Sequence, residues 1–314
     1  MTASRTTQFV QESCSVCYLG FIAALAAILN FPLLFFPELA ALAYEVIRNP
    51  GGKWARSPFF LALTPPLTGV VGVCIVNAFP YGPLSMILAI VLCIAIVRGL
   101  RSPVAPAISA GVLPVALSVD SWLYPLAIAV GTSMLAGIAV MSRSKEIPSE
   151  TQAPVHATNR DWLIGLSVFV AIAALVAFFT GQRMILFPPL VVIAYEMFVH
   201  RKDCPWGREP FKLAPTCFLT AAIGVAAVEL LGHGALSTIL SMTMGIVVIK
   251  SLRLHLPPAL AVGLIPQIME QPSWIYAASV FTGCLLLTGV FVLHQRLFEH
   301  RRTTAISFEG TSDG

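Results

Sequence analysis

The chain has 314 residues, of which 57% are hydrophobic and 11% are charged, and its mean hydropathy is +0.84. This composition is too apolar for a soluble globular protein of that length, so it predicts an integral membrane protein whose main partner is the lipid bilayer. The net charge of +4 does not indicate nucleic-acid binding, because the lysines and arginines fall between apolar stretches, where membrane topology explains them.

Twelve apolar stretches are predicted to form membrane helices, six in each half of the chain. In the first half they cover residues 16–31, 33–47, 59–79, 84–97, 103–119 and 122–141. In the second half they cover residues 162–180, 184–199, 211–231, 236–249, 256–269 and 274–293. The second and fourth stretches of each half are shorter than the about 20 residues of a typical spanning helix. We expect them to tilt little or to be broken helices shielded by their neighbours.

The two sets of stretches come from an internal duplication. FPELAALAYE at residues 36–45 returns as FPPLVVIAYE at residues 187–196, displaced by 151 positions. WARSPF at residues 54–59 returns as WGREPF at residues 206–211, displaced by 152 positions, and this second register then holds to the end of the duplicated region. Two motifs do not keep one register by chance, so each half is one structural unit.

The distribution of positive charge predicts the topology. With six crossings per half and a cytoplasmic N-terminus, 18 of the 19 lysines and arginines lie on one side, and Arg183 alone lies opposite. An even number of crossings makes the two halves parallel repeats. A re-entrant segment at residues 103–119 would invert the second half and move Lys250 and Arg253 outside, so we reject it. The predicted fold is all-α, with about twelve transmembrane helices in two parallel six-helix repeats and both termini on the cytoplasmic side of a plasma membrane.

Domain boundaries follow the polar segments. We predict a first transmembrane repeat (1–141), a cytoplasmic linker (142–160), a second transmembrane repeat (161–295) and a basic, then disordered cytoplasmic tail (296–314). We expect no cleavable signal peptide, because the first apolar stretch lacks a preceding basic segment and runs on as a membrane helix.

Four cations lie where the fourth stretch of each half meets the proline-marked fifth: Arg98 and Arg101, with their counterparts Lys250 and Arg253. One interpretation is that they are ordinary cytoplasmic-loop cations. The other is that they converge near the two-fold axis, beside helix starts whose free N–H groups and positive dipole ends suit a small anion. In that case Arg98 and Lys250 form the anion-selective part of a path, and Arg101 and Arg253 form its electrostatic entrance.

Two glutamates end the short second stretch of each half in the same A-Y-E motif. Glu45 and Glu196 can be interfacial carboxylates paired with Arg48 or a neighbouring cation. Alternatively, they gate the path or couple protons by pairing with Arg98 or Lys250, since partly buried carboxylates with a movable partner serve as relay groups in transporters.

Two further pairs of polar side chains accompany these charges. Tyr44 and Tyr195 belong to the A-Y-E motifs and join the gating candidates, although tyrosine at a membrane surface is more typical of an anchor than of a ligand. Thr64 and Thr216 are candidates for hydrogen-bonding an anion, but they can equally bond to their own helix.

No catalytic motif occurs in the chain. The sequence has no G-x-S-x-G elbow, no H-E-x-x-H, no phosphate-binding glycine loop and no dinucleotide fingerprint, so we do not expect an enzyme. His233 and His255 are single histidines without metal-ligand spacing. Cys14 and Cys17 form a lone C-x-x-C without a second pair. We therefore expect neither a metal nor a cofactor.

Three segments resemble motifs of a known family: RSP at residues 56–58, the glycine helix with TGVVGV at residues 68–73, and above all LHLPPALA at residues 254–261. On these segments, each half from about Leu33 or Met184 onward resembles the HPP family of integral membrane proteins, so the chain is similar to a doubled HPP unit. Plant and cyanobacterial members are associated with nitrite transport. The resemblance therefore implies a small inorganic anion as substrate.

Two functions remain open on the sequence. The first is a transporter or channel for a small inorganic anion such as nitrite or nitrate, indicated by the paired cations at proline-marked junctions. The second is a non-transporting membrane scaffold or partner subunit, indicated by the short helices and the lack of a strongly polar membrane centre. A homo-oligomer is compatible with either.

Overall fold

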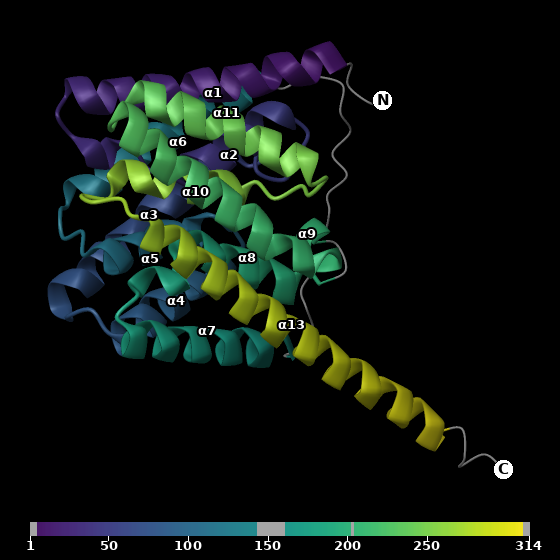
Figure 1. Ribbon diagram of the computed structural model, residues 1–314. Helices are drawn as coiled ribbons and strands as arrows, with labels where there is room; N and C mark the ends of the chain where they lie inside the picture. The colour runs from purple at the N-terminus through teal and green to yellow at the C-terminus, as the bar shows by residue number, and fades with distance from the viewer. Residues whose placement is uncertain (1–4, 143–160, 202–203, 310–314) are drawn as a thin grey trace.

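The computed structural model describes residues 5–142, 161–201 and 204–309, and this part of the chain is helical with no strand (Figure 1). The first half contains α1 (Arg5–Ile28), α2 (Leu39–Arg48), α3 (Pro58–Ala78), α4 (Pro83–Gly99), α5 (Ala107–Leu117) and α6 (Leu123–Met141). The second half contains α7 (Asp161–Thr180), α8 (Pro188–Val199), α9 (Pro205–Arg208), α10 (Leu213–Leu231), α11 (Ala235–Ser251), α12 (Pro258–Leu264) and α13 (Trp274–Glu309). Short 3-10 segments are η1 (Pro32–Leu34), η2 (Arg183–Leu186), η3 (Pro210–Lys212) and η4 (Ile265–Ile268).

Within the described residues, six helices are long and apolar enough to cross a membrane: α1, α3, α6, α7, α10 and α13. They expose many large apolar side chains, among them Phe21, Leu126 and Phe179, which in a soluble protein would be in contact with water. The protein is therefore an α-helical membrane protein, as its composition predicts. Helices α4 and α11 have 17 residues each, so they are shorter than a typical span.

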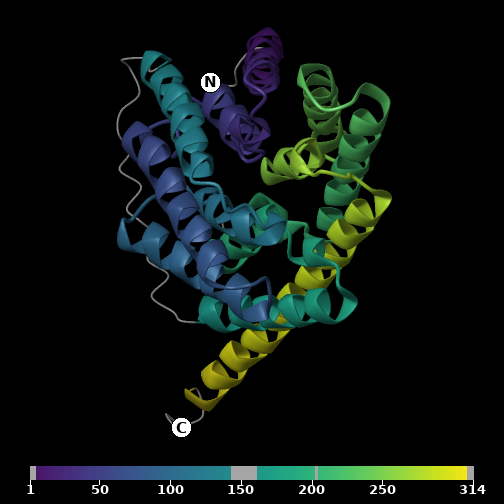
Figure 2. The same ribbon diagram turned by 90° about the vertical axis from the view of Figure 1, so that its left-hand side faces the viewer.

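Four short helices, α2, α5, α8 and α12, form the centre of the bundle (Figure 2). Every residue of α8 and of α12 is buried. A helix that is apolar on all sides needs neighbours on all sides, and the longer helices supply them. Helices α1 and α7 lie at opposite edges of the bundle (Figure 1), where α1 packs against α11 and α7 packs against α4.

Matching contacts occur in the two halves, between residues that the duplicated register pairs. The Tyr124 hydroxyl donates to the carbonyl oxygen of Ala110 at 2.8 Å. The Tyr276 hydroxyl donates to the carbonyl oxygen of Val262 at 2.7 Å. Each bond ties the first turns of a long helix, α6 or α13, to a short central helix, and so holds that central helix in place.

Close backbone approaches also match. A Cβ added at Gly72 would collide with the carbonyl oxygen of Gly111, and one added at Gly224 would collide with that of Gly263. Glycine at these positions lets α3 pack tightly on α5 and lets α10 pack tightly on α12. The short helices are thus fixed from a second side.

Apart from the second stretch of each half, which divides as expected into η1 with α2 and η2 with α8, three differences between the observed helices and the predicted stretches are notable. Helix α1 begins at Arg5, 11 residues before the apolar stretch, and Glu12 in this additional segment pairs with Lys250 of α11. The stretch at residues 256–269 divides into α12 and η4. Helix α13 continues to Glu309, through most of the tail for which the composition predicts disorder. Residues 143–160 of the linker and residues 310–314 lie outside the described residues.

Candidate functional site

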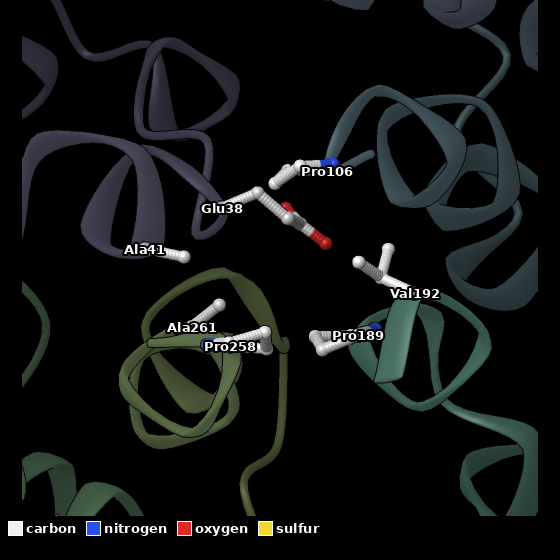
Figure 3. Close-up of a pocket in the computed structure, with 7 residues that line it drawn as sticks. All are labelled: Glu38, Ala41, Pro106, Pro189, Val192, Pro258 and Ala261. Carbon is white, nitrogen blue, oxygen red and sulfur yellow. The ribbon is translucent and has the colours of Figure 1, made fainter. Parts of the chain in front are cut away.

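A cavity of about 10 Å³ lies in the middle of the molecule, between the first turns of the four short helices (Figure 3). This volume suits about one water molecule. The lining comes from both halves and consists of Glu38, Ala41, Pro106, Pro189, Val192, Pro258 and Ala261.

The four helices direct their N-terminal ends at this cavity. Glu38 immediately precedes α2, Pro106 immediately precedes α5, Pro189 lies in the first turn of α8, and Pro258 begins α12. Proline suits the first helical turn because its fixed φ is already helical. It carries no N–H, however, so at this place the helices supply the positive field of their dipoles rather than free hydrogen-bond donors.

Glu38 is the ionisable group of the cavity, and it is only 2% exposed. Its Oε1 atom accepts a hydrogen bond from the Ser109 hydroxyl of α5. Its Oε2 atom has no hydrogen-bond partner, and the carboxyl group points into the space between the four helices (Figure 3). The duplicated register places Pro189 and Ala261 where the first half has Glu38 and Ser109.

Sequence reasoning missed Glu38, although a signal was present. The duplicated motif reads FPE in the first half and FPP in the second, so one half carries an acid inside an otherwise apolar segment. An ionisable residue within a membrane segment is a candidate functional residue by default, because its burial is costly.

A first charged cluster surrounds the C-terminal end of α2. The Oε2 atom of Glu45 lies 3.0 Å from Nε2 of His255, and the Asn49 side chain donates to its Oε1 at 3.2 Å. Beside them, the Arg48 guanidinium lies over the Tyr44 ring at 5.4 Å from its centroid. Tyr44 therefore serves as a packing surface for a cation.

Lys250 reaches the same cluster from α11. Its Nζ atom lies 2.6 Å from Oε2 of Glu12, a buried carboxylate on α1, and Nε of Arg48 lies 3.6 Å from the other oxygen. Glu12 thus joins α1, α2 and α11. Sequence reasoning missed it because it lies before the apolar stretch that was predicted to form the first helix.

A second charged cluster surrounds the C-terminal end of α8. Nζ of Lys53 lies 3.1 Å from Oε1 of Glu196, and Nδ1 of His200 lies 2.7 Å from Oε2. Arg98 stacks on the Trp162 ring of α7, 4.7 Å from its centroid, and the Trp162 ring in turn lies 6.2 Å from the Tyr195 ring.

The contacts of the two A-Y-E glutamates agree with the first interpretation, pairing with a neighbouring basic side chain, rather than with pairing to Arg98 or Lys250. Arg98 and Lys250, proposed from the sequence as their partners, bind elsewhere in the same two clusters. The bases that contact the glutamates are His255 for Glu45, and Lys53 together with His200 for Glu196. Each glutamate also contacts the side chain four residues later, which is Asn49 for Glu45 and His200 for Glu196. The two clusters therefore have the same local arrangement.

Arg101 and Arg253 are exposed, and each lies one residue beyond the C-cap leucine of α4 or α11. Each has a φ of 53°, in the left-handed region that glycine usually occupies after a helix. The next N–H groups, of Ser102 and Leu254, then donate back to the carbonyls of Val97 and Ile249. An arginine at such a position therefore carries a backbone cost in both halves.

The two threonine candidates have intramolecular partners. The Thr64 hydroxyl donates to the Ser102 hydroxyl at 2.9 Å, and Ser102 in turn accepts from the backbone N–H of Val104. The Thr216 hydroxyl donates to the carbonyl of Lys212 in the preceding turn. Thr64 therefore fixes the loop that leads into α5, whereas the Thr216 hydroxyl bonds only to a backbone carbonyl one turn earlier in the sequence.

The structure does not bring the four predicted cations to the central cavity, whose lining contains none of them. Arg98 and Lys250 lie in separate clusters at the ends of α4 and α11. Within the described residues no group of three or more histidine, cysteine, aspartate or glutamate side chains could hold a metal ion. Comparisons with protein-family models, with curated proteins and with solved structures each give no match to this chain.

Proposed function

We propose that the protein is a transporter or channel for a small inorganic anion of the nitrite or nitrate type. The observation that carries this proposal is the convergence of α2, α5, α8 and α12, which all begin at one central cavity (Figure 3). Broken helices whose N-terminal ends meet near the middle of a membrane form the substrate sites of many transporters, and their dipoles favour an anion. The resemblance to the HPP family supports the same substrate class.

The proposed topology has about twelve crossings, in two parallel repeats of six, with both termini in the cytoplasm at a plasma membrane. In support, the first turn of α1 and the last turn of α13 lie on the same side of the bundle (Figure 1). An even number of crossings requires this. The clusters around Glu45 and Glu196 then face the cytoplasm together with the basic loops.

In this proposal Arg98 and Lys250 select the anion, Arg101 and Arg253 attract it, and Glu45 and Glu196 gate its passage. Lys250 has a side chain that is 50% exposed and bound to a buried carboxylate, so an arriving anion competes with Glu12 for it. The described cavity is small, which means that passage requires the short helices to move apart.

Flux into liposomes tests the proposal. Purified protein should carry nitrite or nitrate down a gradient, and the Arg98→Gln, Lys250→Gln double variant should lose most of this flux. Arg296→Gln removes an exposed cation on α13 outside both clusters and is the matched control. Parent flux equal to that of protein-free liposomes, or full flux in the double variant, would contradict these roles.

The alternative function, a non-transporting scaffold or partner subunit, is favoured by one observation. The central cavity has room for about one water molecule and its walls are apolar apart from Glu38. Absence of flux for nitrite, nitrate and chloride together would favour the scaffold.

A further inference from the structure

Glu38 is a buried acid without a cation. Helices α1, α6 and α12 pack against α2, and Ser109 reaches Glu38 from α5. Two titratable side chains that interact with it electrostatically are Tyr124 of α6 and Tyr276 of α13, whose hydroxyls already donate to backbone carbonyls. The nearest charged side chain on α2 itself is Glu45, at the other end of the helix. Within the described residues, therefore, no positive side chain compensates a charge on Glu38.

The environment favours the neutral form of this carboxyl. An ionised carboxylate that is removed from water and left without a cation costs several kcal/mol, and a buried group avoids that cost by binding a proton. A neutral Glu38 carries an O–H group on the oxygen that lacks a protein partner. The adjoining cavity has room for about one water molecule, which could accept that hydrogen bond.

The fold does not need an acid at this position. The second half builds the same turn with Pro189 and the same helix face with Ala261. The backbone of Glu38 itself has a φ of −68°, which proline also adopts. Since the second half forms the same turn without a carboxyl, the architecture does not require Glu38 and Ser109, and the pair is available for a chemical role.

Glu45 and His255 form a titratable pair on the face of α2 that also carries Glu38. Glu45 follows Glu38 by seven residues, which is two helical turns and a rise of about 10 Å. Ala41, which lines the cavity, lies between them on this face. Glu45 contacts His255, whose side chain is 40% exposed, so this pair lies at the surface end of the face that carries Glu38.

We propose that Glu38 is a proton-binding site, and that the proton it carries moves together with the transported anion. The coupling to anion transport rests on the proposed function, whereas the proton-binding site does not. In the loading step a hydronium ion loses one O–H bond and an O–H bond forms at Glu38, with no change of oxidation state. Neutralising Glu38 removes the negative charge from the point where the helix dipoles converge, so an anion can then enter. Release of the proton and the anion on the other side of the membrane regenerates the Glu38 carboxylate. The cycle is therefore electroneutral for a monovalent anion.

Infrared spectroscopy of the purified full-length protein tests the proton site without any transport assay. At pH 7 the parent should show a C=O band of a protonated carboxyl that is lost in Glu38→Gln and kept in Glu270→Gln, which alters an exposed acid. A second variant, Glu38→Pro with Ser109→Ala, copies the second half and should lose the same band if Glu38→Gln does not fold. A parent without this band at pH 7, or a band that persists in both Glu38 variants, would overturn the proposal.

Flux with a pH-sensitive dye inside the liposomes tests the coupling. A nitrite gradient should drive proton movement in the parent, and the Glu38→Gln variant should lose it, whereas Glu270→Gln should keep it. Equal proton movement in Glu38→Gln and parent, corrected for protein-free liposomes, would overturn the coupling. If no anion is carried at all, the proposed function fails, and the infrared band alone decides whether Glu38 is the protonated group of the core.

Discussion

The carboxylate of Glu45 lies 3.0 Å from the imidazole of His255, which follows it by 210 residues. A second pair has the reverse arrangement, since Glu196 of the second half is bound by Lys53 of the first. Each half thus supplies the acid of one pair and the base of the other. Any movement of the halves that separates the ends of α2 and α8 from these loops has to break both pairs.

The strength of the Glu45–His255 pair can be measured with a double-mutant cycle of Glu45→Gln and His255→Gln. We expect a coupling free energy of about 0.5–1 kcal/mol, because the pair is partly exposed and exposed ion pairs are weak. Thermal unfolding in detergent gives the measurement. Strictly additive effects of the two substitutions would show that the contact contributes nothing.

Arg101 allows its backbone and its charge to be tested separately. Arg101→Gly should stabilise the protein by about 1 kcal/mol, because glycine adopts the left-handed conformation without strain. Arg101→Gln keeps the strain and removes only the charge. Both variants should lower anion flux most at low ionic strength, since an exposed charge is screened beyond about 8–10 Å in ordinary salt. A flux loss that is independent of salt would contradict the role of an electrostatic entrance.

Cysteine labelling tests the proposed topology. In a variant without the seven native cysteines, single cysteines at Ser121 and Ser273 should react with an impermeant maleimide added outside the cell. Single cysteines within residues 142–160 should react only after the membrane is opened. Labelling of that segment in intact cells would exclude six crossings in the first half.

Cys204 should be a poor nucleophile although it lies in a loop between membrane helices. Burial raises the pKa of its thiol to about 12, so almost none of it is thiolate at pH 8. Alkylation by iodoacetamide at pH 8 should therefore be much slower at Cys204 than at the exposed Cys14, as read by mass spectrometry of peptides. Similar rates at the two sites in the folded protein, with similar rates also after denaturation, would contradict the burial.

Arg183 and Tyr81 form a contact on the side of the molecule opposite the basic loops. The guanidinium lies 4.1 Å from the centre of the ring, and it also donates to the Ser118 hydroxyl at 2.8 Å. Burial raises the pKa of Tyr81, and Arg183 partly offsets that rise by stabilising the phenolate. Arg183→Gln should therefore raise the pKa of Tyr81 further, measured as the tyrosinate absorbance lost in Tyr81→Phe. A lower pKa in Arg183→Gln would contradict the proposed contact.

Much of the helical layout could be predicted because it depends on local composition. The apolar stretches, the prolines at helix starts and the duplicated register all lie within short windows of sequence. The expected break of the second stretch also agrees with α2, which forms only at Leu39–Arg48. The helix through residues 298–309 was not expected, because polar composition alone does not tell a helix from a disordered tail.

The site was less predictable because its contacts are long-range. Whether Glu38 faces lipid, water or a cavity depends on four helices from both halves, and a single helix pattern does not encode this. The partners of Glu45, Glu196 and Lys250 likewise come from distant loops or from α1. Charge and register could place these residues on the correct helix ends, but they could not pair them.

The difference between Glu38 and Pro189 bears on how such a molecule could have evolved. In a dimer of two identical chains, every side chain beside the two-fold axis is present twice. Two acids facing each other across so small a cavity would repel when ionised and could share one proton. Fusion of the two units into one chain removes that restriction, because each copy can then change alone. A chain that contains both units can therefore have one acid and one proline at its centre, whereas a homodimer of the single unit cannot.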